Sequence, residues 1–171
     1  MGIYMEAFQH FVWATRKREH YITDDIERAL HRHIRQSCKD LKVHVHALNG
    51  MPDHVHLAVT LPAPLAPADF MHQVKGASGH FINHRPGAQD CFYWQEGYGL
   101  LTFTSNDLPR IVRYVDRQKE HLAAGKLSAK MERAADWELP TPRSGVSLAV
   151  GRIAVPFMAW FLTAWFPSIS R

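Results

Sequence analysis

Gly50-Met51-Pro52-Asp53-His54-Val55-His56-Leu57-Ala58-Val59 is the stretch around which the chain is organised. A Gly/Pro/Asp turn leads into an apolar strand, and two histidines separated by one hydrophobic residue stand near its start. Successive side chains of a strand point to opposite faces, so His54 and His56 share one face, about 7 Å apart, while Val55 points into the other layer. Two imidazoles in that arrangement can bind one metal ion.

Size and composition indicate a globular chain with a basic surface. The 171 residues suit one domain with a possible appendage, and the hydrophobic fraction of 46% is enough for a core. The net charge of +4 and the pI near 9.2 favour a polyanionic partner. Two distant cysteines, Cys38 and Cys91, suit a reducing cytoplasm. The N-terminal residues lack the pattern of a signal peptide, so we expect a cytoplasmic protein.

Hydrophobic periodicity predicts the order β-α-β-β-α-β followed by one more helix. Alternating residues predict strands over 5–14, 42–48, 54–61 and 98–104. Helical spacing predicts a first helix over 24–40, a second that begins near Pro67 and includes Phe70 to Phe81, and a third from Ser105 or Asn106 to Gly125. This is the split βαβ, ferredoxin-like pattern, an α+β fold in which an antiparallel sheet carries helices on one face.

The third predicted helix carries two residues that could take part in chemistry. Tyr114 and Gln118 are i, i+4 neighbours and share a face beside the apolar stripe. A tyrosine hydroxyl can act as a nucleophile. A glutamine carbonyl oxygen is an acceptable ligand for Mg²⁺ or Mn²⁺. The plainer alternatives are a boundary residue for Tyr114 and a solvent-edge residue for Gln118.

A second histidine pair, His44 and His46, lies on the neighbouring predicted strand. A lone His-x-His on a strand is more often structural than metal-binding. Only His54 and His56 follow a Gly/Pro/Asp turn, so we expect the first pair to be sheet-face or packing residues.

Five segments together resemble the small single-tyrosine HUH transposases, the insertion-sequence and REP-associated tyrosine transposase-like family. HUH stands for histidine–hydrophobic–histidine. The segments occur in the family's order, cover roughly residues 5–125, and are Phe11-Val12-Trp13-Ala14-Thr15, Gly50 to Leu57, Asp69-Phe70-Met71-His72-Gln73-Val74-Lys75-Gly76-Ala77-Ser78, Trp94-Gln95-Glu96-Gly97-Tyr98-Gly99, and Arg113-Tyr114-Val115-Asp116-Arg117-Gln118-Lys119-Glu120-His121. Their order also agrees with the fold predicted from periodicity.

The resemblance implies a role for each matching residue. His54, His56 and Gln118 would bind Mg²⁺ or Mn²⁺, and Tyr114 would be the nucleophile. The implied reaction is cleavage and rejoining of single-stranded DNA at hairpin-marked element ends through a 5′-phosphotyrosine, in a homodimer and without a nucleotide cofactor. For phosphate contacts we single out four cations, with solvated surface charge as the alternative: Lys75, Arg16, Lys17 and Arg18.

Two other activities remain open. One is a domesticated or inactive relative that binds hairpin DNA without transposition, and the other is a metal-dependent hydrolase that uses water in place of Tyr114.

The resemblance ends near Gly125. We expect a domain over 1–125, a helix extension and linker over 126–147, and an atypical apolar tail over 148–171. Residues 148–166 just reach bilayer-spanning length, but Arg152 and Pro156 interrupt them. A loosely docked or exposed tail is therefore expected in preference to a membrane span.

Overall fold

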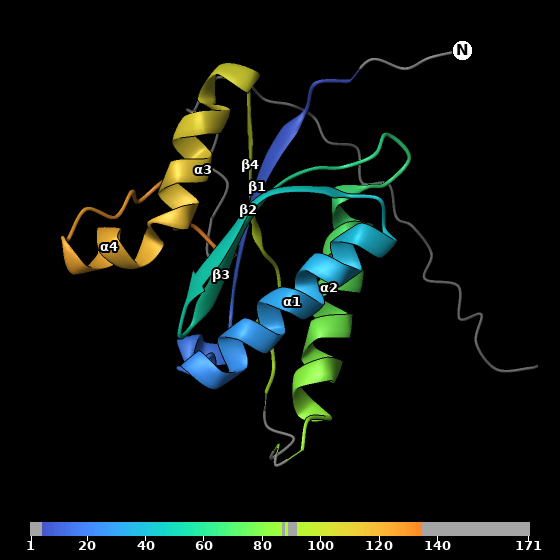
Figure 1. Ribbon diagram of the computed structural model, residues 1–171, viewed down its shortest axis with the longest axis vertical. Coiled ribbons are helices and arrows are strands. Elements are labelled where there is room, and N and C mark those ends of the chain that lie inside the picture. The colour runs from blue at the N-terminus through green and yellow to red at the C-terminus, as the bar shows by residue number, and fades with distance from the viewer. Residues whose placement is uncertain (1–4, 87, 89–91, 135–171) are drawn as a thin grey trace, which may run out of the picture. The chain divides into compact units, whose positions relative to one another are not determined.

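A four-stranded antiparallel sheet with helices on both faces forms the described part of the chain, residues 5–86, 88 and 92–134 of the computed structural model (Figure 1). The strands are β1 (Phe8–Ala14), β2 (His44–Met51), β3 (His54–Thr60) and β4 (Gly99–Phe103), in the spatial order β2-β3-β1-β4. The helices are α1 (Asp24–Asp40), α2 (Pro67–Asn83), α3 (Leu108–Asp116) and α4 (Gln118–Ala123), with short 3₁₀ turns η1 (Arg16–Arg18) and η2 (Ser105–Asp107). The predicted ferredoxin-like α+β fold is confirmed.

The two faces of the sheet bury different sets of side chains. Helices α1 and α2 pack side by side on one face (Figure 1), where Phe11, Trp13, Val55 and Leu57 form the main core with them. Helix α3 covers the opposite face, where Ile111 and Val115 belong to a smaller cluster with Ala47, Ala58 and Met131. Because strand side chains alternate, His10, His54 and His56 belong to the α3 face.

The third predicted helix is interrupted, contrary to the sequence expectation. Helix α3 ends at Asp116, and Arg117, at φ −100° and ψ 23°, separates it from α4. Asn49 Nδ2 donates a hydrogen bond of 2.9 Å to the Asp116 carbonyl, which satisfies an acceptor that the helix end leaves free. Gln118, the first residue of α4, is fully buried, although the sequence placed it at the edge of the apolar stripe.

The helix extension expected from residue 126 is wrong for residues 126–134, which form turns and irregular chain. Gly125 has φ +63°, its N–H bonds to Leu122 O, and the Lys126 N–H bonds to His121 O. This is the hydrogen-bonding pattern of a helix that ends at a left-handed glycine. The chain then returns over the sheet, and Met131 and Ala134 are buried. The packed unit therefore extends beyond the boundary expected at residue 125.

The returning chain passes close to the edge strand β4. A Cβ atom built on Gly99 would lie 1.8 Å from the carbonyl oxygen of Arg133, which is far inside van der Waals contact. Only glycine therefore permits this approach of the two backbones.

The apolar tail expected over 148–171 lies outside the described residues. Within the described part of the chain, no helix has the length and apolar character needed to cross a bilayer.

Candidate functional site

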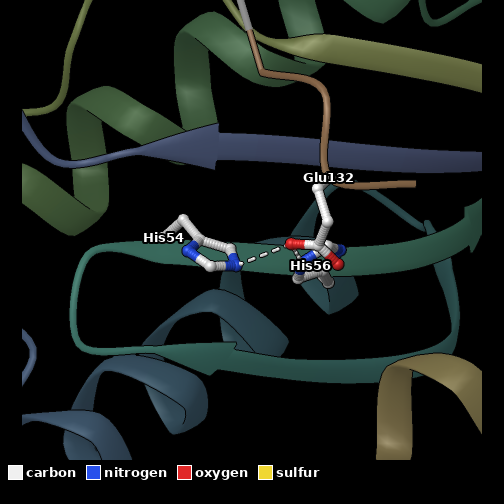
Figure 2. Close-up of side chains that lie close together, drawn as sticks. All are labelled: His54, His56 and Glu132. Atoms are coloured by element: carbon white, nitrogen blue, oxygen red, sulfur yellow. Dashed lines mark ion pairs between the residues drawn. The ribbon is translucent and has the colours of Figure 1, made fainter. Parts of the chain in front are cut away.

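His54 and His56 project from β3 into the same buried space (Figure 2). Their exposed fractions are 6% and 0%. His54 Nδ1 lies 2.6 Å from Asp53 Oδ1, and the other oxygen of that carboxylate accepts a hydrogen bond of 3.2 Å from Arg18. The turn that precedes β3 thus fixes the ring of His54 and leaves its Nε2 atom facing the site.

His10 fixes the second histidine from the adjacent strand β1. Its Nε2 atom lies 3.0 Å from His56 Nδ1, both rings are fully buried, and they stack at 5.1 Å between centroids. Burial, with the nearby ring of His56, lowers the pKa of His10 to about 3, so His10 is neutral. His56 therefore also presents Nε2 to the site.

Glu132, carried by the returning chain, lies between the two histidines (Figure 2). Its Oε2 atom is 3.3 Å from His54 Nε2 and 3.4 Å from His56 Nε2. Candidate ligand atoms of these three residues lie within 4.8 Å of one another. No sequence signal singled out Glu132, since it stands in a segment without a recognisable motif.

Tyr114 and Gln118 reach the other oxygen of Glu132. Gln118 Nε2 donates a hydrogen bond of 2.8 Å to Oε1, and the Tyr114 hydroxyl donates a short one to the same atom. The Ser128 N–H in turn donates to the Tyr114 oxygen at 3.1 Å. The ring centroids of Tyr114 and His56 lie 6.2 Å apart. The four residues singled out from the sequence thus meet around one carboxylate, all within one chain.

The surroundings of the site shift the pKa values of its groups in different directions. Burial disfavours a charged His54, but the carboxylates of Asp53 and Glu132 outweigh burial and raise its pKa above the ordinary value. The pKa of Glu132 is lowered, because the two histidines outweigh the burial of its carboxylate. Burial and the bond to Glu132 raise the pKa of Tyr114 to about 12. The tyrosine is therefore neutral here.

The donor set suits a divalent metal ion. His54 Nε2, His56 Nε2 and Gln118 Oε1 are buried and make no well-formed hydrogen bond among the described residues, although both imidazole nitrogens lie 3.3–3.4 Å from Glu132 Oε2. Imidazole nitrogens are common ligands of divalent first-row metal ions, and carboxylate and amide oxygens are ligands that Mg²⁺ and Mn²⁺ accept. Each histidine has its second nitrogen held, as is usual for metal-bound imidazoles. The residues therefore fit a divalent metal ion, the class of ion that the sequence analysis expected.

The first histidine pair lies elsewhere, as its lack of a turn suggested. His44 pairs in register with Thr60, at the end of β3 opposite His54. His46 Nε2 lies 2.8 Å from the Thr60 hydroxyl. Neither joins the cluster around Glu132.

The four expected phosphate contacts have different surroundings. Lys75 Nζ donates two hydrogen bonds of 2.7 Å to the carbonyls of Gln95 and Gly97, so it holds a loop in place. Arg16 lies over the Tyr93 ring at 5.9 Å, and Lys17 is exposed in the same 3₁₀ turn. Arg18 is the one that borders the histidine site, through Asp53.

Comparison with known proteins places this arrangement in context. The sequence profile of the family described as "Transposase IS200 like" matches residues 4–118. The ISDra2 transposase TnpA of Deinococcus radiodurans is 26% identical over 125 residues, covering 70% of this chain and 89% of that protein.

Two solved structures share the fold. One is a Deinococcus radiodurans R1 protein assigned as a transposase, with a TM-score of 0.55 and 25% identity over 69% of this chain and 95% of the other. The second is a REP-associated tyrosine transposase bound to a REP hairpin, with a TM-score of 0.55 and 18% identity over 74% of each chain.

Proposed function

We propose, because this chain belongs to the IS200-like transposase family, that it cleaves and rejoins single-stranded DNA through a covalent bond to Tyr114. The observation that carries the proposal is the convergence of Tyr114, His54 and His56 on one carboxylate. A hydrolase that used water would have no need of a tyrosine hydroxyl at this place.

In the proposed step, the Tyr114 oxygen attacks the phosphorus of the scissile phosphodiester. A bond forms between that oxygen and phosphorus, and the bond from phosphorus to the 3′ oxygen breaks. The products are a 5′-phosphotyrosine and a free 3′-hydroxyl, which in net receives the tyrosine proton. The new ester retains the energy of the old one, so rejoining needs no nucleotide cofactor.

His54, His56 and Gln118 would hold Mg²⁺ or Mn²⁺ beside the tyrosine. When bound, the ion would polarise the phosphate and offset negative charge that develops on its oxygens. The chain's own contribution is orientation: Asp53 and His10 hold the two imidazoles, and the Ser128 N–H holds the Tyr114 oxygen. The raised pKa of Tyr114 means that its proton must be lost during the attack.

The proposed substrate is single-stranded DNA with hairpins at the element ends. The basic net charge and the cationic turn Arg16–Arg18 beside the site support a polyanionic partner. One structural neighbour was solved with a hairpin bound. A homodimer stays a prediction from the family resemblance.

Tyr114→Phe tests the proposal most directly, because it removes one oxygen and keeps the ring that packs beside His121. With labelled hairpin-bearing DNA and Mn²⁺, we expect the wild-type protein to form a covalent adduct on denaturing gels. The variant should bind DNA and metal as the wild type does, yet give no adduct. Cleavage by Tyr114→Phe would make water the nucleophile and contradict the proposal.

A further inference from the structure

We propose that Glu132 is an additional ligand of the metal ion, which makes the site anionic and extends it beyond the part of the chain that matches the family. The inference rests on the proposed function, since it assumes an ion at His54 and His56. The profile match ends at Gln118. Glu132 lies 14 residues later in the sequence, in the segment that returns over the sheet.

The position of Oε2 supports coordination. Two donor atoms that each lie about 2.1 Å from one ion, at angles between 90° and 110°, are about 3.0–3.4 Å apart. Glu132 Oε2 lies 3.3 Å and 3.4 Å from the two Nε2 atoms. These separations match ligands of a shared ion, so the carboxylate does not have to move away for the ion to bind.

The position of Oε1 shows how the carboxylate is held. A carboxylate can only accept hydrogen bonds, so Gln118 must turn its NH₂ group toward Glu132. This is the arrangement observed, at 2.8 Å, and it leaves Gln118 Oε1 without a partner among the described residues. The amide can therefore support Glu132 with its nitrogen while its oxygen serves the ion.

Charge also favours this assignment. Two neutral imidazoles and an amide bring no negative charge to a divalent ion, whereas Glu132 brings one unit from a half-buried position. Four protein ligands would still leave room in the coordination sphere of a bound Mg²⁺ or Mn²⁺ for a DNA phosphate.

The test is Mn²⁺ binding by calorimetry on the full-length chain without DNA. Glu132→Gln keeps the size of the side chain and one acceptor oxygen but removes its charge, and Glu132→Ala removes the ligand altogether. Glu120→Gln, at an exposed position of α4, is the matched control. We expect Mn²⁺ affinity to fall at least about tenfold in both Glu132 variants and to stay within about twofold in the control. Thermal unfolding in EDTA checks that each variant is folded.

An Mn²⁺ affinity that does not fall in Glu132→Gln would overturn the inference. Unchanged or higher Mn²⁺ affinity in Glu132→Gln would mean that the carboxylate only occupies the place of the ion and leaves when the ion binds. His54→Ala separates this outcome from failure of the proposed function. If His54→Ala loses Mn²⁺ binding and Glu132→Gln does not, only the role of Glu132 falls. If His54→Ala keeps Mn²⁺ binding, the histidine site itself is wrong.

Discussion

His10 offers a quantitative test of how the buried histidines cooperate. A neutral imidazole that binds an ion through Nε2 carries its proton on Nδ1. For His56 that N–H would point at His10 Nε2, 3.0 Å away in a fully buried place. His10→Phe keeps an aromatic ring but cannot accept this hydrogen bond.

The expected loss follows from the burial of that contact. Leaving one buried donor without a partner costs about 1–3 kcal/mol. Loss of an outer partner of a metal-bound histidine typically lowers metal affinity about 10–100-fold, which is ~1.4–2.7 kcal/mol and agrees with the first range. Without metal, the proton of His56 can sit on Nε2, where it faces Glu132. The folding free energy of the metal-free protein should therefore change less than its metal affinity.

Calorimetric titration with Mn²⁺ at one pH, paired with thermal unfolding in EDTA, measures both quantities. We expect His10→Phe to bind Mn²⁺ about 10–100-fold more weakly and His10→Gln, whose amide oxygen can accept the bond, to recover part of the loss. The reasoning would be refuted if His10→Phe bound Mn²⁺ as tightly as the wild type. It would also be refuted if His10→Gln lost as much affinity as His10→Phe.

Two further predictions concern the boundaries of the active unit. Truncation after residue 136 should keep Mn²⁺ binding and cleavage. Truncation after residue 125 should lose both, because it removes Glu132 and the buried Met131. Equal activity of the two truncated proteins would contradict the assignment of the returning segment to the site. A mixture of His54→Ala and Tyr114→Phe proteins should form no covalent adduct, since Tyr114 meets His54 and His56 within one chain. Adduct formation by the mixture would show that the tyrosine acts on a partner's histidines.

The fold and the histidine pair were accessible from the sequence because they depend on local periodicity. Alternation along 54–60 places His54 and His56 on one face whatever the strand pairs with. The position of His10 depends on the register of β1 against β3, in which Val12 pairs with His56, and local patterns do not encode that register. Glu132 was missed for a related reason: a left-handed glycine ends α4, and the path of the chain after it depends on tertiary contacts. The break at Arg117 has no proline or glycine to announce it.

The tight approach of Arg133 to Gly99 bears on how copies of a transposase gene lose their activity. Any single-nucleotide change that replaces this glycine introduces a Cβ where the carbonyl oxygen of Arg133 lies 1.8 Å away. The returning segment would have to lift from β4, and Glu132, one residue before Arg133, would shift with it. One codon change at Gly99 would thus inactivate the protein while the histidine pair, the tyrosine and the glutamine all stay in the sequence. A survey that infers transposition activity from those four residues alone would count this inactive copy as active.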